Sequence, residues 1–446
     1  MNRTYFFVRK LQLFLLLSLC TLTNIKAQEL KDSISFTLPQ VLDIALNENP
    51  TIKIANKEIS LKKEAKKEAY AGLFPELSLT GSYSRAIKKQ TMVMAFGGEP
   101  TTIKVGSDNT YNGGLVISLP VFAPALYQSI NLTQSDVDLA VEKARSSKLG
   151  LINQVTKAFY QLLLTQDSYE VLEKSYLQAQ ANFDVVNAKF QHGSVSEYDK
   201  IRADVQVRSL KPTLVSARNG VNLARMQLKV LMGIDSNWNI AVQGNLEDYE
   251  MIMFRQQLSS DSLNLQNNTD LKQLDLNAKL LENTQKLQRT NFLPTLGASF
   301  NYLYMSMNND FKISHYDWYP YSTLGLNLTI PLFKASNFTK LNQTKIQMIQ
   351  LKYNKVNLKR QISMQVESYL DNMRASTEQV LSNKENVAQA LKGREIARKR
   401  YEVGKGTILE LNDAEVALTQ AQLTYNQSIY DYLTAKADLD KLLGGE

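Results

Sequence analysis

The sequence predicts an α+β protein of two structural repeats, in which pairs of amphipathic strands alternate with long helical hairpins. Three observations lead to this fold class. The two halves of the 446-residue chain align with a constant offset, each half contains stretches with a two-residue apolar period, and each contains long helical runs with a seven-residue period.

The repeat is visible in matching segments of the two halves. "KFQHGSVSEYDKIRADVQV" at 189–207 corresponds to "RYEVGKGTILELNDAEVAL" at 400–418. Matching residues lie 211 positions apart, as in the pairs Pro120 and Pro331, Gly193 and Gly404, and Gly233 and Gly444. Upstream the offset is 219, from Pro75 to Pro294, so one strand connection is longer than its counterpart. We therefore expect two repeats, at 28–233 and 266–446, joined by a linker at 234–265.

The first 27 residues have the features of a removable export signal. Basic residues precede the apolar run "LQLFLLLSL", and Ala27 offers a small residue at the cleavage position. Cys20 follows Leu19 rather than the small residue of a lipoprotein signal, which disfavours lipidation. The leader holds four basic residues and no acidic ones, so its removal lowers the net charge from +8 to +4. A charge this small, with acids interspersed among the bases, does not indicate nucleic-acid binding.

Each half opens with helices and then changes to a two-residue period, which predicts strands at about 76–86, 111–121, 295–304 and 321–332. In "PELSLTGSYS", Leu77, Leu79 and Tyr83 share one face, and serine and threonine occupy the other. Such strands fit either a sheet packed on a protein core or a membrane barrel with lipid outside and water inside. Four strands cannot close a membrane barrel, so a barrel would need several chains.

The connections between the strands are long and polar. The segment 87–110 resembles an external loop, and the segment 304–321 brings several aromatic residues next to a strand. Aromatic residues at strand ends are typical of the interfacial girdle of a membrane barrel, and here they are Tyr316, Trp318, Tyr319 and Tyr321.

Very long helices follow each strand pair. The runs 125–191 and 335–403 contain one glycine each and no proline. The helix that returns from each run has a seven-residue period, which is typical of side-by-side coiled-coil packing. In the second half this series is Leu411, Leu418, Tyr425, Tyr432 and Leu439.

Taken together, these residues resemble the TolC-like outer-membrane efflux protein family. The resemblance is carried by the duplicated strand pairs, the long helices and "RYEVGKGTILELNDAEVALTQAQ" with its weaker copy "KFQHGSVSEYDKIRADVQVR", and it covers essentially the whole chain after the leader. It implies an α+β membrane protein that is a homotrimer, in which each protomer gives four strands to a shared twelve-stranded β-barrel in outer-membrane lipid. Coiled-coil helices would form a periplasmic α-barrel, with 234–265 in an equatorial layer.

The same resemblance implies a function and partners. The chain would be the outer-membrane channel of a tripartite efflux or type I secretion system. It would passively conduct substrates that reach it from an inner-membrane transporter and a periplasmic adaptor protein.

Two glycine-containing segments, 191–196 and 402–407, are predicted to be turns between antiparallel helices, because glycine adopts positive φ at helix ends. A phosphate-binding loop would need a preceding strand and a Lys-Ser/Thr pair, which "GKGT" lacks. Ser196 and Thr407 are predicted to cap the helices that follow. Under the family resemblance these tips dock the adaptor, through Gly193, Ser194, Gly404, Lys405 and Gly406.

Glu410 and Asp413 lie on one helix face just after the second tip. They are either a solvated acid pair favoured by the helix N-terminus or, as the resemblance implies, part of a ring at the narrowest point of a pore. The resemblance adds Asp199, which corresponds to Glu410, and Tyr401, which is otherwise a core residue. Threefold symmetry would turn each acid into a ring that favours cations. Gly406 stands where some family members have a basic gate residue, so the resemblance does not decide whether a salt bridge holds the pore closed in this chain.

No catalytic, metal or cofactor site is predicted. His192 and His315 are the only histidines, and neither has an acid or nucleophile at motif spacing. The alternative to a channel is a soluble periplasmic coiled-coil adaptor or scaffold protein, which would share the glycine turns. Such a protein would not have paired amphipathic strands duplicated at the roots of both helical hairpins.

Overall fold

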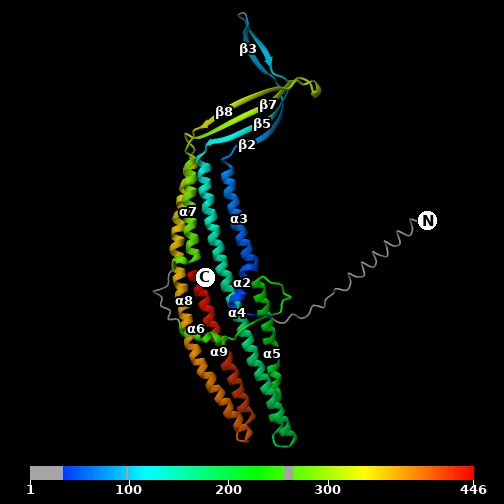
Figure 1. Ribbon diagram of the computed structural model, residues 1–446, viewed down its shortest axis with the longest axis vertical. Helices are drawn as coiled ribbons and strands as arrows, with labels where there is room; N and C mark the ends of the chain where they lie inside the picture. The colour runs from blue at the N-terminus through cyan, green and yellow to red at the C-terminus, as the bar shows by residue number, and fades with distance from the viewer. Residues whose placement is uncertain (1–33, 97–98, 256–264, 446) are drawn as a thin grey trace, which may run out of the picture. The chain divides into compact units, whose positions relative to one another are not determined.

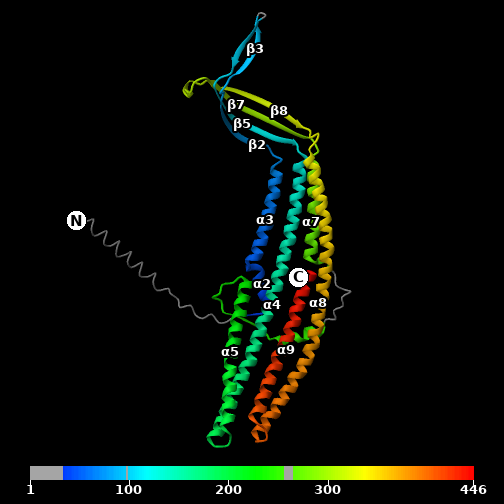
Figure 2. The same cartoon turned by 180° about the vertical axis from the view of Figure 1, so that it is seen from behind.

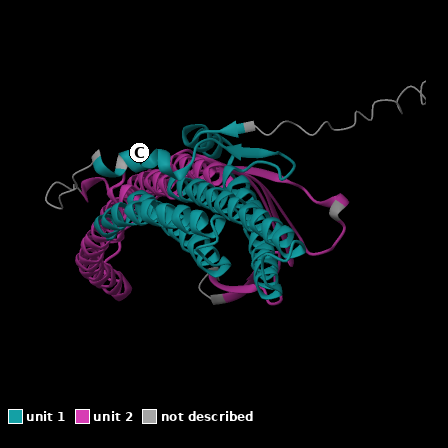
Figure 3. Cartoon of the chain, turned by 90° about the horizontal axis from the view of Figure 1, so that it is seen from below, with its two compact units in different colours: residues 1–49, 151–257, 372–437 teal, residues 50–150, 258–371, 438–446 magenta. Residues whose placement is uncertain are grey.

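The computed structural model describes residues 34–96, 99–255 and 265–445. The leader predicted at 1–27, with Cys20, lies outside the described residues, as does the linker segment 256–264. The chain divides into two compact units, coloured separately in Figure 3. Unit 1 comprises residues 1–49, 151–257 and 372–437, and unit 2 comprises residues 50–150, 258–371 and 438–446.

Unit 2 contains an antiparallel four-stranded sheet, labelled in Figures 1 and 2. Its strands follow the order β2 (Glu76–Arg85), β5 (Asn109–Phe122), β7 (Thr295–Asn308) and β8 (Tyr319–Thr329). Strand β8 ends before Ile330 and Leu332, which the alternating pattern had placed in the strand. Within the described residues β2 and β8 each pair on one side only, so both edges of the sheet are open.

The strand register gathers the apolar positions on one face of the sheet. One row across all four strands consists of Leu77, Ile117, Phe300 and Leu324. These side chains are 65%, 37%, 41% and 79% exposed, so no described part of the chain covers the face. The adjacent row on the opposite face consists of Glu76, Ser118, Ser299 and Gly325. The sheet therefore has one apolar and one polar face, as the alternation predicted.

The segment interpreted as an external loop contains a second, two-stranded sheet in unit 2. Strands β3 (Gln90–Phe96) and β4 (Glu99–Val105) form an antiparallel hairpin between β2 and β5. The equivalent connection in the second repeat holds only a short 3-10 helix, η4 (Ile313–His315), among its described elements. This hairpin accounts for the greater length of the first connection.

The helices of unit 2 reach one end of the sheet in both views of Figures 1 and 2. They are α3 (Pro50–Ala71), α7 (Thr269–Thr290), which follows η3 (Leu265–Asn267), and the first parts of α4 (Pro124–Gln191) and α8 (Ala335–Glu402). Lys279 on α7 forms an ion pair with Asp138 on α4 at 3.1 Å. Among the described residues, no helix combines the length and apolar character needed to cross a bilayer.

Unit 1 contains two helical hairpins and a small outer layer. The hairpins consist of the later parts of α4 and α8 and their partners α5 (Glu197–Met232) and α9 (Ile408–Leu443). The outer layer contains the parallel pair β1 (Ile34–Phe36) and β6 (Ile240–Val242), followed by helices. These helices are α2 (Leu38–Glu48), η1 (Leu246–Tyr249) and α6 (Glu250–Arg255).

The repeat is reproduced in the bounds of the elements. Helices α4 and α8 each have 68 residues, α5 and α9 each have 36, and α3 and α7 each have 22. The contacts at the ends of α5 and α9 correspond as well. The side-chain amide of Asn49 donates to the Leu231 carbonyl in unit 1, and that of Asn268 donates to the Leu442 carbonyl in unit 2, both at 2.7 Å. Gly233 and Gly444, each at φ 71°, allow this approach, since a Cβ atom there would lie 2.8 Å from Asn49 Cα and 2.1 Å from the Asn267 carbonyl oxygen.

The heptad positions form the buried side of the returning helices. Leu411, Leu418, Tyr425, Tyr432 and Leu439 are all less than 10% exposed. In α5, Val207, Val221 and Leu228 of the matching series are also buried. The seven-residue period therefore identified the packed face of both helices.

Candidate functional site

Both hairpin tips are built by the same turn. Gly193 and Gly404 each adopt φ 72°, just beyond the ends of α4 and α8. The amide of the next residue reaches back five positions, from Ser194 to the Lys189 carbonyl at 2.9 Å and from Lys405 to the Arg400 carbonyl at 2.8 Å. This is the Schellman arrangement, which satisfies carbonyls at a helix end and needs a residue that tolerates positive φ.

The helices that leave the tips begin at the predicted caps. Ser196 Oγ accepts a hydrogen bond from the Asp199 amide at 3.2 Å, and Thr407 Oγ1 accepts one from the Glu410 amide at 3.2 Å. At the first tip the Asp199 carboxylate also accepts from the Ser196 amide and hydroxyl, at 3.3 and 2.7 Å. Asp199 is therefore held in a capping box on its own helix.

The Glu410 carboxylate has a different partner. It lies 3.4 Å from a guanidinium nitrogen of Arg400, across the turn of the second tip. Both side chains are about half exposed, at 54% for Arg400 and 44% for Glu410. Asp413 is exposed on the same helix, one turn further on. The second tip thus presents two acids to solvent, one of which is partly neutralised by an arginine.

Gly406 packs closely in this turn. A Cβ atom at this position would lie 3.0 Å from Arg400 Cβ and 3.1 Å from the Tyr401 backbone nitrogen. The lack of a side chain therefore brings the turn against the residues that carry Arg400 and Tyr401.

A small apolar cluster, here called the tip cluster, joins the two hairpins within unit 1. Its buried members come from all four helices or their tips: Val186, Ala203, Tyr401, Ile408 and Leu411. The Lys189 ammonium, on the first hairpin, lies 4.5 Å from the centre of the Tyr401 ring, on the second. The Tyr401 hydroxyl is buried and has no hydrogen-bond partner among the described residues. Burial, and secondarily the charge of Asp199, raises the pKa of Tyr401 above its ordinary value.

The candidate residues thus fall into two groups. Tyr401 and Asp199 lie near each other at the contact between the hairpins. Glu410 and Asp413 lie on the exposed side of α9, and Gly193, Ser194, Gly404 and Lys405 form the exposed ends of the tips.

Above the tips, a buried carboxylate ties the outer layer to the second hairpin. Glu250, at the start of α6, is 8% exposed. It accepts hydrogen bonds from the Lys384 ammonium at 2.7 and 3.0 Å and from the Tyr425 hydroxyl at 3.1 Å. Burial, with the charge of Glu250 next, raises the pKa of Tyr425.

A second carboxylate ties the outer layer to the first hairpin. Asp167, on α4, accepts a hydrogen bond from the Leu246 amide at 2.9 Å, where η1 begins. The pKa of Asp167 is raised to about 6. Burial raises it most, the hydrogen bond from Leu246 opposes this, and the charge of Glu170 adds to the rise. Residues 246–250 are therefore held by one carboxylate contact to each hairpin.

Several of these residues were missed by sequence reasoning, although the hairpin symmetry contained a signal for them. In an antiparallel hairpin that turns near Lys405, residues at equal distances on either side face each other. Arg400 and Glu410 satisfy this relation, and so do Arg394 with Glu415, which lie 3.9 Å apart, and Lys384 with Tyr425, which share the Glu250 carboxylate. Lys189 and Asp167 had no comparable signal, because their contacts are with another hairpin or with the outer layer.

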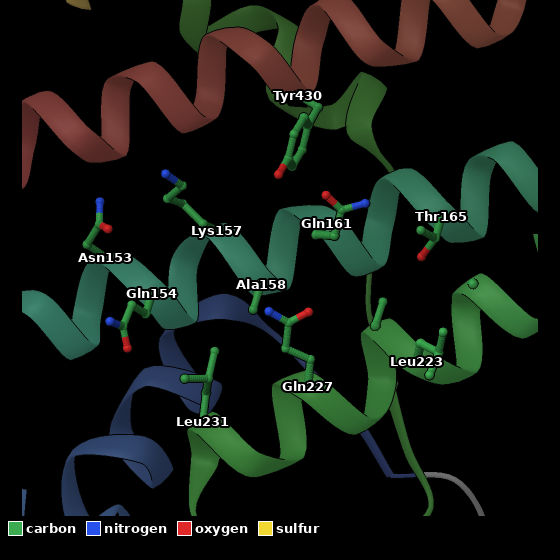
Figure 4. A pocket seen from close by; sticks show the side chains of 12 residues that line it. Asn153, Gln154, Lys157, Ala158, Gln161, Thr165, Leu223, Gln227, Leu231 and Tyr430 are labelled. Atoms are coloured by element: carbon green, nitrogen blue, oxygen red, sulfur yellow. The ribbon is translucent and has the colours of Figure 1, made fainter. Parts of the chain in front are cut away.

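A cavity of about 680 Å³ lies in unit 1 between α4, α5 and α9 (Figure 4). Amide and hydroxyl side chains face it, among them Gln161 and Thr165 on α4, Gln227 on α5 and Tyr430 on α9. Lys157 is the charged residue of its lining, which includes no carboxylate, histidine or cysteine. Among the described residues no group of three or more His, Cys, Asp or Glu side chains is placed to hold a metal ion.

Comparison with known proteins gives one family for both repeats. Residues 41–234 and 262–445 match the sequence profile of the family described as outer membrane efflux protein. The chain is 21% identical over 412 residues to outer membrane protein TolC of Vibrio cholerae, with 91% of this chain and 90% of that protein covered. It is 22% identical over 415 residues to the alkaline protease secretion protein AprF of Pseudomonas aeruginosa, with 92% and 84% covered.

The fold is likewise similar to a solved channel. The structure of the Campylobacter jejuni CmeC outer membrane channel superposes with a TM-score of 0.73 at 20% sequence identity, covering 92% of this chain and 85% of that one. The match extends over both repeats, so it covers the sheet and the helical hairpins alike.

Proposed function

Because the chain belongs to the outer membrane efflux protein family and is an outer-membrane channel that extends into the periplasm, we propose that it works as a passive duct formed by three copies. Each copy gives its four strands to a shared barrel of twelve. The chain's relatives in this family imply that it is a trimeric channel that works with efflux partners.

The observation that carries the proposal is the sheet in unit 2. It has an uncovered apolar face, a polar opposite face and two open edges, β2 and β8. An exposed strand edge with an apolar face is unfavourable for a protein in water. Pairing β2 of one copy with β8 of the next removes both edges and leaves the apolar face toward lipid and the polar face toward a water-filled interior.

The aperture of this duct is proposed to lie at the hairpin tips. Three copies of Glu410 and Asp413 would form a ring of acids that attracts cations and repels anions. Arg400 reduces the charge of the Glu410 ring, and the contact between Lys189 and Tyr401 holds the second hairpin against the first. Asp199 and Tyr401 would then stabilise the arrangement in which the two hairpins are in contact.

The exposed ends of the tips are proposed to dock a periplasmic adaptor, which links the duct to an inner-membrane transporter. Gly193, Ser194 and Gly404 are small and exposed, which allows close approach of another helical protein, and Lys405 adds an exposed cation beside them. Gly406, which packs inside the turn, would keep the second tip in the shape that docks. The relatives include a protein named for protease secretion and others named for efflux pumps, so the cargo of this chain is either a polypeptide or small molecules.

The assembly is tested by solubilising membranes in mild detergent and comparing heated with unheated samples on a denaturing gel. A trimeric band that converts to a monomer on heating supports the proposal. Recovery of the chain as a soluble periplasmic monomer would support the adaptor or scaffold alternative instead, and a band at monomer size in unheated membrane samples would reject the shared barrel.

A further inference from the structure

The hairpin β3–β4 has one apolar face that stays partly exposed among the described residues. Its register pairs Met92 with Ile103, and Gln90 with Val105. Met92, Met94, Ile103 and Val105 therefore lie on the same side and are 43%, 40%, 40% and 42% exposed. These four side chains are called the hairpin apolar face.

The opposite side of the hairpin differs in character. It pairs Thr91 with Lys104 and Val93 with Thr102, so polar groups alternate with a single large apolar side chain among the described ones. A two-stranded hairpin in water is marginally stable unless it packs against something. The hairpin apolar face is the side suited to such packing, because its four apolar side chains are neighbours, with the polar Gln90 and Thr101 beside them.

The base of the hairpin is tied to the four-stranded sheet. The Lys89 ammonium lies 3.2 Å from the Asp108 carboxylate and donates to Asn309 Oδ1 at 2.8 Å. The same Asn309 oxygen accepts from the Asp108 amide at 2.9 Å, and the Ala86 amide donates to the Asp108 carbonyl at 2.8 Å. Because Asn309 belongs to the β7–β8 connection, three segments of unit 2 meet at this base.

The position of the base disfavours lipid as the covering partner. The apolar face of the large sheet ends at Tyr83 and Tyr111, whose ring centres are 4.8 Å apart. Arg85 and Asn109 follow as the last residue pair of β2 and β5. In membrane barrels aromatic residues mark the boundary with water. The hairpin begins beyond this boundary, at Gln90, and so extends from the water side.

A second copy of the chain fits the face better. Strand β3 follows β2 after the short link 86–89, and β2 is an edge strand of the large sheet. In the proposed trimer this edge pairs with the neighbouring copy, so each hairpin stands at a junction between copies. We propose that the hairpin apolar faces of the three copies pack against one another on the outer side of the barrel. This inference rests on the proposed trimer, whose cyclic symmetry places the three hairpins at equivalent positions around one axis, so that a contact made by one hairpin with its neighbour is made by all three.

The test uses single cysteines on the two sides of one strand. Met92→Cys lies on the hairpin apolar face and Val93→Cys, its neighbour, on the opposite side, each in a chain with Cys20→Ser. Purified detergent-solubilised protein is treated with a short bismaleimide, then heated and separated on a denaturing gel. Severalfold more covalent dimer from Met92→Cys than from Val93→Cys is expected, and Ile103→Cys, the cross-strand neighbour of Met92, should behave like Met92→Cys.

Unheated samples separate failure of this inference from failure of the trimer. If the variants run as trimers and the two cysteines cross-link equally or not at all, the packing of the hairpins is refuted and the channel proposal stands. Complete reaction of Met92→Cys with a charged maleimide, without cross-linking, would show that the hairpin apolar face is open to water in the trimer and refute it. Equal protection of Met92→Cys and Val93→Cys from both reagents would show that the covering is not specific to the hairpin apolar face and refute it as well, and a monomer before heating would refute both proposals.

Discussion

The ammonium nitrogen of Lys189 lies 4.5 Å from the centre of the Tyr401 ring, so that a cation on the first helical hairpin rests against a buried aromatic ring on the second. The two residues occupy neighbouring positions of the repeat, since Lys189 corresponds to Arg400 and Tyr401 to Phe190. In the second repeat the corresponding cation, Arg400, pairs instead with Glu410. The tip therefore uses equivalent positions for two different contacts, one between the hairpins and one across a single turn.

Replacing Lys189 should loosen the contact between the hairpins. Lys189→Met removes an interaction worth about 0.5–1 kcal/mol at a partly exposed site, and single-channel recordings in planar bilayers should show a larger mean conductance. Lys200→Met is the matched control, because Lys200 lies 4.9 Å from the Phe190 ring within the first hairpin. Equal effects of the two substitutions would show that the contact between hairpins has no special role.

Replacing Arg400 should make the aperture more selective for cations. Arg400→Ser removes the charge that partly neutralises Glu410, and an exposed ion pair contributes roughly 0–1 kcal/mol, so stability should change little. Reversal potentials in a salt gradient should shift toward cations, and divalent cations should block at lower concentration. Arg398→Ser is the control, because Arg398 lies 3.6 Å from Glu402 rather than from Glu410. A shift toward anions in Arg400→Ser would place Glu410 away from the pore.

The hydrogen bond between Tyr425 and Glu250 should contribute to the stability of the second hairpin. Tyr425→Phe leaves one hydrogen bond of a buried carboxylate unmade, which costs about 1–3 kcal/mol. The temperature at which the trimer converts to monomer should fall. Tyr401→Phe removes a hydroxyl that has no partner among the described residues, so it should leave this temperature unchanged or raise it. The reverse order of the two variants would contradict the assigned contacts.

The stability of unit 1 should depend on pH through Asp167. Burial raises the pKa of this carboxyl from 3.8 to about 6, so between about pH 4 and pH 6 the folded chain binds the proton more tightly than the unfolded chain. The contribution of Asp167 to stability therefore falls as the pH rises through this range. Asp167→Asn keeps an acceptor for the Leu246 amide but cannot titrate.

The trimer dissociation temperature of Asp167→Asn should consequently decline less than that of the wild type from pH 4 to pH 6. Above pH 6 the variant should be more stable by roughly 1–2 kcal/mol, after allowance for partial solvent screening. Asp184→Asn changes an exposed carboxylate on the same helix and should follow the wild-type curve. Parallel curves for all three proteins would show that Asp167 titrates at its ordinary pKa.

Much of the architecture was predictable from local patterns. The 211-residue offset gave the equivalence of α4 with α8 and of α5 with α9, and the glycines gave both turns, because a Schellman turn needs positive φ at one position. The two-residue period identified the apolar face of the sheet. The β3–β4 hairpin was missed because its strands lie in a segment whose polar and glycine residues favour a loop.

The candidate site was less predictable, because its contacts join residues far apart in the sequence. The cap at Thr407 followed from spacing, whereas the contact of Lys189 with Tyr401 depends on how one hairpin packs on the other. Glu250 had no signal either: hairpin symmetry places Lys384 opposite Tyr425, but Glu250 reaches them from α6, which lies in the outer layer and far away in the sequence. The role of Glu410 and Asp413 depends further on the assembly of three copies.

Block of single channels by divalent cations tests the central claim most directly. Purified trimers of the wild type and of Glu410→Ala/Asp413→Ala are compared in planar bilayers, with Glu402→Ala as an exposed acid outside the proposed ring. The account predicts discrete cation-selective channels in the wild type and a divalent-blocking concentration at least about tenfold higher in the double variant, equivalent to about 1.4 kcal/mol. Absence of channels in the wild type would contradict the outer-membrane duct, and identical block in all three proteins would remove Glu410 and Asp413 from its aperture.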